Sequence, residues 1–327
     1  MVGRGLVVRK VLITGDFEIA LDAFPQSFQW IHIRRPRDAQ QIIDVLAEVD
    51  DYILGGPEYF SASMIDAAVS LENLVVMGTG TSSFVDVDYA IERGIRIFNT
   101  PHLNFGAVVE FTLAMITVCT ARVFESVVGV KEGGQWLQTP RPPITGLKVG
   151  IVGLGVIGKA LARELKHRGC EQVCYWSRTR DLQLEAGLGI DYMSIESLVS
   201  YTDIVCIHMT YNAETHALFD SALLNRLRPT SMIFNLSNPR IICPIALRHF
   251  LTTHPDAFCF IDGFYNEWID NKGSADDPYR LLPLSARNLV VTSHLAAQEE
   301  QVVGEIFAQA AARVCQLAAQ DGRYDES

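Results

Sequence analysis

Short apolar runs alternate with segments of helical periodicity over the first hundred residues. Five runs rich in branched side chains predict β-strands, at 10–14, 30–33, 52–54, 74–77 and 95–98. Residues 38–48 and 61–70 carry apolar side chains at intervals of three and four, which predicts helices between these strands. Strands and helices that alternate in this way form right-handed crossovers and a mainly parallel sheet.

The alternation starts again after a stretch dense in Gly and Pro at 131–146. Six further apolar runs predict strands, at 149–152, 173–176, 204–209, 232–236, 258–261 and 289–292. These runs are continuous, which is typical of parallel strands that are covered on both faces. One long helix is expected from Asn104 to about Val130, and another after His294. The pattern therefore predicts an α/β fold with two parallel sheets in two Rossmann-like or flavodoxin-like domains.

The composition is that of a folded chain with an acidic surface. Of the 327 residues, 49% are hydrophobic and 20% are charged. The net charge of −11 opposes binding to nucleic acid, because an acidic surface repels phosphate. No apolar run reaches the roughly 18 residues of a membrane span, and no cleavable leader is expected. Seven cysteines at irregular spacing fit reduced thiols better than disulfides or a zinc site. We therefore expect a cytoplasmic protein without a nucleic-acid or membrane partner.

The sharpest local motif is a glycine-rich turn between a predicted strand and a predicted helix. It reads Gly153-Leu154-Gly155-Val156-Ile157-Gly158. In such a turn the first glycine permits the bend, the second lets a pyrophosphate approach the backbone, and the third lets the helix pack on the strand. The helix N-terminus then offers N–H groups to the phosphates. We therefore predict that this turn binds a dinucleotide.

The residues after the next strand select the dinucleotide. NAD enzymes usually place Asp or Glu here, where the carboxylate accepts hydrogen bonds from the adenosine ribose. This chain instead has Ser177, Arg178, Thr179 and Arg180. Arginines pair with a 2′-phosphate, which a carboxylate would repel, and hydroxyls can hydrogen-bond to it. The alternative is that both arginines are solvated loop residues. The missing acid and the added arginines together favour NADP, with NADPH preferred over NADH.

The order of these pieces resembles that of the D-2-hydroxyacid dehydrogenase family, including members of the hydroxypyruvate/glyoxylate reductase and phosphoglycerate dehydrogenase types. The resemblance covers nearly the whole chain and includes the segments GIRIFNTPHLN, GLKVGIVGLGVIGKALA, FNLSNPRIICPIAL, FIDGFYNEW and LVVTSHLAA. It implies a dinucleotide-binding domain of residues 104–294 and a substrate domain formed by residues 1–103 and 295–327. It also implies a homodimer.

The resemblance assigns an acid–base pair, with His294 as proton donor or acceptor and Glu267 as its partner. Hydride transfer to a ketone leaves an alkoxide, and histidine can supply the proton near neutral pH. A carboxylate on the other ring nitrogen fixes the tautomer and stabilises the imidazolium. Taken alone, such a histidine is more often structural, and such a glutamate is more often a surface acid.

The sequence departs from the family at the arginine that holds the substrate carboxylate. Asn238 stands at the position of that arginine, and Arg240 follows two residues later. Either Arg240 reaches the site from a remodelled loop, or Asn238 offers only neutral hydrogen bonds there, which are roughly half as strong. We hypothesise that the substrate is a 2-keto acid held in another way, or a related carbonyl compound. Pyruvate, glyoxylate and hydroxypyruvate would then be poor substrates.

The resemblance implies further groups around the substrate and the cofactor. A turn is expected to offer backbone N–H groups to the substrate carboxylate, and it comprises Gly78, Thr79, Gly80 and Thr81. His102 either lines the pocket or is a surface histidine. Asp262 either holds the nicotinamide carboxamide or caps a loop. The walls of the cofactor cleft are expected to include Thr210, Leu236 and Val108.

These inferences combine into an NADP(H)-dependent oxidoreductase. A hydride passes between the nicotinamide and a carbonyl or 2-hydroxy group of a small molecule, and closure of the two domains excludes water. The alternative is a nucleotide-sensing protein that keeps the dehydrogenase fold with little or no turnover. The missing arginine favours that alternative, whereas the pair of His294 and Glu267 favours the enzyme.

Overall fold

The chain folds into two compact units. The computed structural model describes residues 8–21, 24–133, 136, 138, 140–265, 277–284 and 288–320. One unit comprises the described residues up to Asn104 together with those from Glu299 onward. The other comprises the described residues from Phe105 to Gln298. A segment from the end of the chain therefore completes the first unit.

A five-stranded parallel sheet forms the centre of the first unit. Its strands are β1 (Arg9–Thr14), β2 (Phe28–Ile33), β3 (Asp51–Leu54), β4 (Asn73–Val76) and β5 (Arg96–Asn99). Their order is β2-β1-β3-β4-β5, and every neighbouring pair is parallel. This is the doubly wound, flavodoxin-like order. The five strands predicted from the sequence are all present, with ends that differ by one or two residues.

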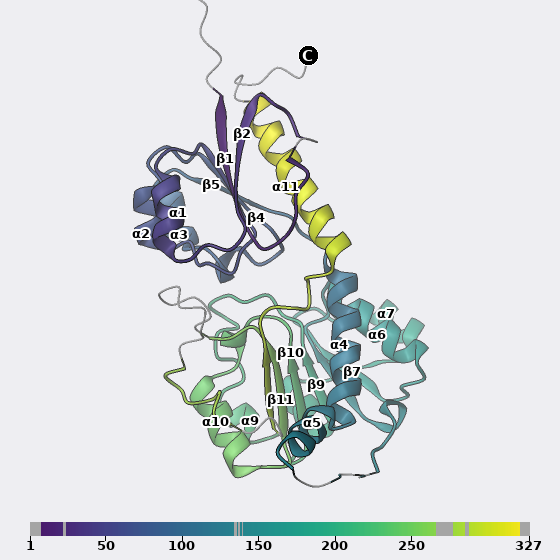
Figure 1. Cartoon of the computed structure of the whole chain (residues 1–327). Coiled ribbons are helices and arrows are strands. Elements are labelled where there is room, and N and C mark those ends of the chain that lie inside the picture. Colours follow the sequence, from purple (N-terminus) through teal and green to yellow (C-terminus); the bar gives the residue numbers. More distant parts are fainter. Residues whose placement is uncertain are drawn as a thin grey trace, which may run out of the picture. The chain divides into compact units, whose positions relative to one another are not determined.

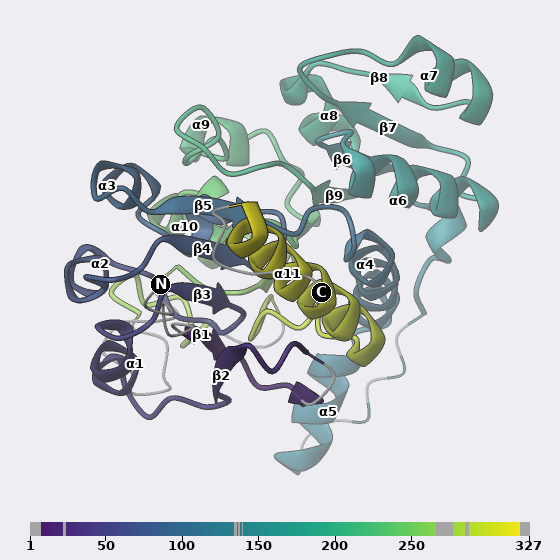
Figure 2. The same ribbon diagram turned by 90° about the horizontal axis from the view of Figure 1, so that it is seen from above.

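Helices cover both faces of the five-stranded sheet (Figures 1 and 2). On one face lie α1 (Ala39–Leu46), α2 (Ala62–Ala67) and α3 (Val87–Glu92), and on the other lies α11 (Glu300–Gln320). By length and composition α11 could cross a membrane. However, Phe307, Ala310 and Val314 of α11 are buried in one apolar cluster with Val11 and Ile53 of the sheet. This helix therefore forms part of the core of the first unit.

A seven-stranded parallel sheet forms the centre of the second unit. Its strands are β6 (Val149–Val152), β7 (Val173–Trp176), β8 (Asp191–Tyr192), β9 (Ile204–Ile207), β10 (Met232–Asn235), β11 (Phe258–Asp262) and β12 (Leu289–Thr292). Their order is β12-β11-β10-β9-β6-β7-β8. The order reverses between β6 and β9, which is the switch point where doubly wound sheets bind ligands. The sequence predicted six of these strands and missed β8, which has two residues.

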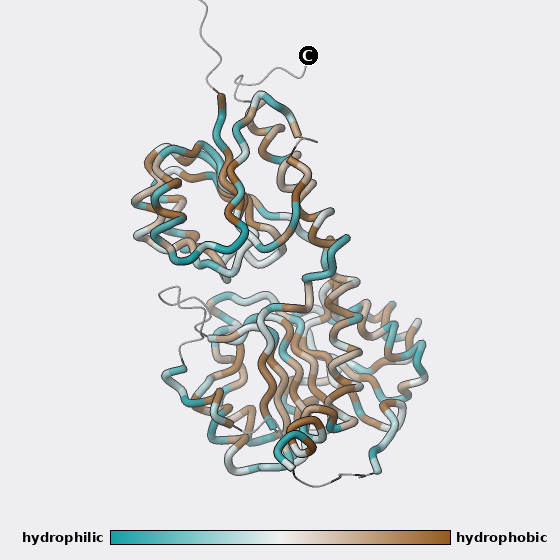
Figure 3. The backbone as a smooth tube through the Cα atoms, in the orientation of Figure 1, coloured by the Kyte–Doolittle hydropathy of each residue, from teal (hydrophilic) through white to brown (hydrophobic). Residues whose placement is uncertain are grey.

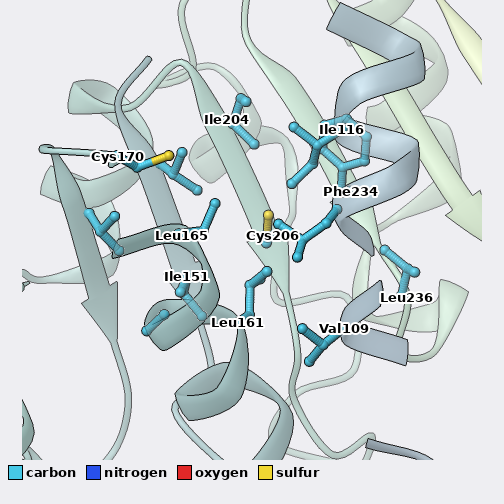
Figure 4. Packing of buried hydrophobic residues seen from close by; sticks show 14 of the residues in the cluster. Val109, Ile116, Ile151, Leu161, Leu165, Cys170, Ile204, Cys206, Phe234 and Leu236 are labelled. Carbon is cyan, nitrogen blue, oxygen red and sulfur yellow. The ribbon is translucent and has the colours of Figure 1, made fainter. Parts of the chain in front are cut away.

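The strands of the seven-stranded sheet are hydrophobic along most of their length (Figure 3), and successive residues such as Val205, Cys206 and Ile207 are buried, so both faces of the sheet are covered. The helices of this unit include α4 (Phe105–Thr120), α6 (Val156–His167), α7 (Leu182–Leu188), α8 (Ile195–Tyr201), α9 (Ser221–Leu224) and α10 (Pro244–Thr253). Leu161 of α6 and Ile116 of α4 share a buried cluster with Ile151, Cys206 and Phe234 of the sheet (Figure 4). On the opposite face, α8 packs so closely that a side chain at Gly150 would collide with Leu198.

The prediction of one long helix from Asn104 to about Val130 is wrong. The segment forms two helices, α4 and α5 (Val123–Lys131), which are bent by 54° at the break between them. Arg122 lies at this break in the left-handed region, with φ of 53°. Thr117 and Thr120 hydrogen-bond through their hydroxyls to carbonyls four residues earlier, a pattern that weakens and bends helices. An apolar pattern alone does not reveal such a break.

Charged and amide side chains link four strands at the amino edge of the five-stranded sheet. The guanidinium of Arg9 donates to both oxygens of Asp51, and its Nη2 also lies 3.0 Å from Glu72. Asn73 donates to Asp51 over 2.6 Å and accepts from Arg96 over 2.8 Å. Arg9 and Asp51 are both buried. These bonds therefore satisfy two buried charges and tie β1, β3, β4 and β5 together.

Replacing Asp51 by Ala should destabilise the first unit. The substitution leaves the Arg9 guanidinium buried beside a weaker set of partners, and breaking a buried ion pair in this way costs about 3–5 kcal/mol. Urea unfolding followed by circular dichroism measures the loss. Glu48→Ala is the matched control, because its ion pair with Lys10 is exposed and screened by solvent, so its loss should change stability little. Equal losses in the two variants would contradict this account.

Candidate functional site

The glycine turn after β6 is packed so tightly that two of its glycines have no room for a side chain. Gly153 has φ of 103°, and a Cβ there would lie 2.3 Å from the carbonyl oxygen of His208. A Cβ on Gly158 would lie 2.1 Å from the carbonyl oxygen of Gly153. The first turn of α6 can therefore approach the end of β6 only with hydrogen atoms at these positions.

The middle glycine of the turn is open instead. Gly155 is the N-cap of α6, and a Cβ there would meet no atom within 4 Å. The helix begins at Val156, and its first N–H groups have no partner within the helix. Ile157 packs on the core beneath, whereas Val156 is exposed. Open space over a row of N–H groups fits the pyrophosphate of a dinucleotide.

The two arginines after β7 differ in how firmly they are held. Arg180 forms an ion pair of 2.7 Å with Glu185 and lies over the ring of Tyr192. Arg178 is 79% exposed and lies 3.4 Å from the exposed carboxylate of Glu214. The Ser177 hydroxyl donates to the carbonyl of Thr179, inside the same loop. Arg178 is thus held more weakly than Arg180, and it can exchange its carboxylate partner for another anion more easily.

A pocket of about 330 Å³ opens between the start of α6 and the loop that follows β7. Its lining comprises Leu154, Lys159, Thr179, Arg180, Asp181, Leu182 and Gln183. The Lys159 ammonium group lies 2.8 Å from Asp181 and lowers the pKa of that carboxyl. Sequence reasoning missed Lys159, although its place directly after the third glycine was a usable signal.

His294 lies in a loop that Asp262 holds in place. This loop follows β12, and His294 has φ of 54°. Both oxygens of Asp262 are engaged, because they accept from the Thr292 hydroxyl over 2.6 Å and from the N–H groups of Leu295 and Ala296 over 2.8 and 2.9 Å. A Cβ on Gly263 would lie 2.7 Å from the imidazole, so the ring packs against the bare backbone there. Glu267 lies outside the described residues.

Asn238 and Arg240 occupy a short 3₁₀ turn after β10. Asn238 is buried, and its side-chain oxygen accepts from the N–H of Arg240 over 2.9 Å, which caps the turn Pro239–Ile241. The carbonyl of Asn238 accepts from Asn235 over 3.0 Å. Arg240 is half-buried, and its guanidinium has no hydrogen-bond or ion-pair partner within the described ranges. Arg240 is therefore the group in this turn that can bind an anion.

The remaining predicted cofactor residues lie at the carboxyl ends of the same strands or on α4. Leu236 and Val108 are buried in the cluster beneath the glycine turn, and Thr210 is exposed after β9. Ser237, which sequence reasoning missed, joins the neighbouring loops: it accepts from Met209 over 3.0 Å and donates to Ile207 over 2.9 Å. These bonds fix the spacing of the loops after β9 and β10.

His208 is a further residue that sequence reasoning missed. It directly follows β9, and its backbone carbonyl presses on Gly153. Its ring is buried, and among the described residues neither ring nitrogen has a hydrogen-bond partner. Burial lowers the pKa of His208 to about 4, so the ring is neutral at physiological pH. A histidine that ends an otherwise apolar strand was the available signal.

The turn predicted to bind the substrate carboxylate belongs to the first unit, after β4. The N–H of Gly78 donates to the Thr100 hydroxyl over 2.8 Å, and the carbonyl of Thr79 accepts from Asn99 over 2.8 Å. Gly80 precedes a 3₁₀ turn at Thr81–Ser83. His102 is exposed in the left-handed region with φ of 71°, two residues after Thr100. The structure thus joins this turn to the end of β5.

The fold and the glycine turn together define a dinucleotide-binding protein. A family model described as "D-isomer specific 2-hydroxyacid dehydrogenase, NAD binding domain" matches residues 113–296. Glyoxylate reductase of Korarchaeum cryptofilum is 28% identical over 297 residues, which are 88% of this chain and 83% of that protein. D-3-phosphoglycerate dehydrogenase of Synechocystis is 27% identical over 310 residues, which are 92% of this chain and 52% of that protein.

Solved structures show the same fold. A phosphoglycerate oxidoreductase from Vibrio cholerae superposes with a TM-score of 0.77 at 19% identity, covering 95% of this chain and 99% of that chain. The family match spans more than half of the sequence, so the chain belongs to the D-isomer-specific 2-hydroxyacid dehydrogenase family. It is an NAD(P)-dependent dehydrogenase that acts on CH–OH donors, which favours the enzyme over the nucleotide-sensing alternative. A nicotinamide cofactor supplies or accepts the hydride when it is bound.

Two alanine substitutions in the glycine turn should affect different properties, one the affinity for the cofactor and the other the stability of the fold. Gly155→Ala should leave the free energy of unfolding unchanged but weaken cofactor binding by about tenfold or more, because the methyl group enters the open space above the N–H groups. Gly158→Ala should lose about 1–3 kcal/mol of stability, because its Cβ overlaps the Gly153 carbonyl. Cofactor fluorescence and urea unfolding measure these effects. Unchanged cofactor affinity in Gly155→Ala would exclude the open side of the turn as the pyrophosphate site.

Proposed function

We propose that this dehydrogenase uses NADPH to reduce a 2-keto acid or a related carbonyl compound, with His294 as the proton donor. The observation that carries the proposal is the Asp262 carboxylate, whose two oxygens hold the loop of His294 through three hydrogen bonds. These bonds give the imidazole a fixed backbone at the carboxyl edge of the sheet that bears the glycine turn. A proton donor has to be positioned in this way before its pKa matters.

In this proposal Asp262 acts through the loop. Its oxygens already accept three hydrogen bonds, from one hydroxyl and two N–H groups, so only one of about four acceptor sites, on Oδ2, is left for a nicotinamide carboxamide. Of the two roles expected from the sequence, capping a loop has the stronger support. Glu267 keeps its predicted role as the partner of His294.

Arg178 is proposed to select NADPH over NADH. No carboxylate occupies the position after β7, where Ser177 stands. Arg178 is exposed and its ion pair with Glu214 is long, so exchanging that carboxylate for a 2′-phosphate costs little. Arg180 would have to leave both Glu185 and the ring of Tyr192. Lys159 faces the same pocket beside Thr179, but its charge is already paired with Asp181.

Arg240 is proposed as an anchor for the substrate carboxylate. The turn Gly78–Thr81 keeps its separate predicted role in binding that carboxylate, through the N–H groups of Thr79, Gly80 and Thr81, because the N–H of Gly78 already donates to Thr100. The free guanidinium of Arg240 supports this choice, whereas the side-chain oxygen of Asn238 is used to cap its own turn. Glyoxylate reductases occur among the relatives. The departure at Asn238 nevertheless leads us to expect poor turnover of pyruvate, glyoxylate and hydroxypyruvate, with other 2-keto acids preferred.

A cytoplasmic homodimer completes the proposal. Helix α5 exposes four valines, and in a soluble protein a second copy of the chain could cover them. These are Val123, Val127, Val128 and Val130.

Replacing His294 by Ala tests the catalytic role. Turnover with NADPH and the best 2-keto acid of a substrate panel should fall by about 10²–10⁴-fold, the usual contribution of a general acid. The Kd of NADPH should stay within about threefold, which shows that the variant is folded. Arg240→Ala should instead raise the KM for the keto acid, with a smaller change for an uncharged carbonyl compound. Undiminished turnover in His294→Ala would remove the assigned proton donor.

Replacing Arg178 by Ala tests the cofactor preference. The Kd of NADPH should rise by roughly 10- to 100-fold, the value of one hydrogen-bonded pair with a charged group, while the Kd of NADH stays constant. Fluorescence titration with both cofactors gives the two constants. Arg180→Ala is the matched comparison and should weaken NADPH binding less. If wild-type protein binds NADH as tightly as NADPH, the proposed preference is wrong.

A further inference from the structure

Near the carboxyl edge of the five-stranded sheet lies a buried glutamate that forms no ion pair with a basic side chain among the described residues. Glu58 follows β3 and has no exposed surface. The hydroxyls of Thr14 and Tyr52 both donate to its Oε1, and its Oε2 has no hydrogen-bond partner among the described residues. Neither Lys, Arg nor His forms an ion pair with it in the part of the chain that the structure describes. Burial is the main cause that raises the pKa of Glu58.

Glu58 closes a turn that is bonded to both ends of the Gly78–Ser83 segment. Before the turn, the carbonyl of Leu54 accepts from Met77 over 2.9 Å. After the turn, Phe60 donates to the carbonyl of Phe84 over 2.7 Å and accepts from Asp86 over 3.2 Å. The residues on either side of the turn, Leu54 and Phe60, are therefore hydrogen-bonded to both flanks of that segment.

The backbone of the turn at residues 55–59 is closely packed at two glycines. A Cβ on Gly55 would lie 2.5 Å from the sulfur of Met77, and a Cβ on Gly56 would lie 2.1 Å from Oε2 of Glu58. The backbone of the turn therefore lies directly on the carboxyl group.

Charge is the property of Glu58 that matters for this packing. As a neutral acid it leaves only one polar atom unsatisfied, which costs about 1–3 kcal/mol. As a carboxylate it would bury an uncompensated charge, at a cost of several kcal/mol that water entry would relieve. Among the described residues, Tyr52 is the titratable side chain that hydrogen-bonds to it, and burial is the main cause that keeps the Tyr52 pKa well above its ordinary value. The charged groups on β2 and on the loops after β1 and β2 have other partners: His32 bonds to the Gly15 carbonyl, and Asp16 pairs with Arg34 and Arg35.

We infer that Glu58, in its neutral form, is a positioning residue for the Gly78–Ser83 segment, and that ionisation of Glu58 loosens this segment. The inference rests on the proposed function only where it concerns the substrate, because that function assigns the substrate carboxylate to this turn. Substrate binding should then weaken as the pH rises, although Glu58 itself does not contact the substrate.

The first measurement is hydrogen exchange in the Gly78–Ser83 segment of the wild-type chain between pH 6 and pH 9, corrected for the intrinsic pH dependence of exchange. It is read at the amides of Gly78 and Ser83, which donate to Thr100 and to the carbonyl of Gly80. Protection of these amides should fall as the pH passes the raised pKa of Glu58, while protection of α6 in the other unit stays constant. In Glu58→Gln the protection should not change with pH, because the amide accepts from both hydroxyls and cannot ionise. Glu48→Gln removes an exposed carboxylate from the same unit and should behave as wild type.

The second measurement is the KM for the 2-keto acid over the same pH range. It should rise by up to about tenfold per pH unit above the pKa of Glu58 in the wild type, beyond the change seen in Glu58→Gln. The Kd of NADPH should be equal in both proteins at every pH. The difference between the two proteins removes the titration of His294, which they share.

The outcomes separate the inference from the function on which it rests. Constant protection of the Gly78–Ser83 amides in the wild type overturns the inference, whatever the kinetics. Protection that falls with pH while the KM difference stays flat supports the positioning role of Glu58 and overturns the assignment of this segment to the substrate. If Glu58→Gln does not fold, the wild-type exchange data alone still decide the inference.

Discussion

The close approach of α6 to the end of β6 is the constraint on which the second unit depends. It requires hydrogen atoms at Gly153 and Gly158, since a side chain at either position would overlap a backbone carbonyl. This contact leaves the N–H groups of the helix facing the open side of Gly155. The parallel order of the sheet then brings the ends of β9, β10, β11 and β12 to the same edge. Tight packing beneath the turn and open space above it are therefore two results of one arrangement.

Most of the fold could be predicted from the sequence, because parallel strands buried on both faces give continuous apolar runs. Eleven strands were predicted in this way, and β8 was missed because two residues carry no periodicity. The break between α4 and α5 was missed for a different reason. It depends on a left-handed Arg122 and on threonine hydroxyls that bond to the preceding turn, neither of which alters the hydrophobic pattern. Local backbone geometry therefore limits such predictions more than composition does.

The candidate site also has features that could be predicted from the sequence and features that could not. The glycine turn could be predicted because its three glycines form a short motif directly between a predicted strand and a predicted helix. The bonds of Asp262 to residues 292–296 could not, since they join segments thirty or more residues apart. The same holds for Glu58, which shares its oxygen with Thr14 and Tyr52 across two strands. A buried acid is difficult to distinguish from a surface acid in a sequence, because both occur in short polar loops.

The strength of the existing ion pairs decides which cations around the proposed cofactor site can serve an anion. An exposed pair such as that of Arg178 with Glu214 contributes about 1 kcal/mol or less, so a phosphate replaces the carboxylate at small cost. Arg180 is held by Glu185, whose carboxylate is mostly buried and also accepts from Tyr175 over 2.7 Å. Withdrawing Arg180 would leave that carboxylate with one partner fewer in a partly desolvated place. Arg180, which looks equivalent to Arg178 in the sequence, therefore has a structural role, and Arg178 is the arginine that we propose to recognise the ligand.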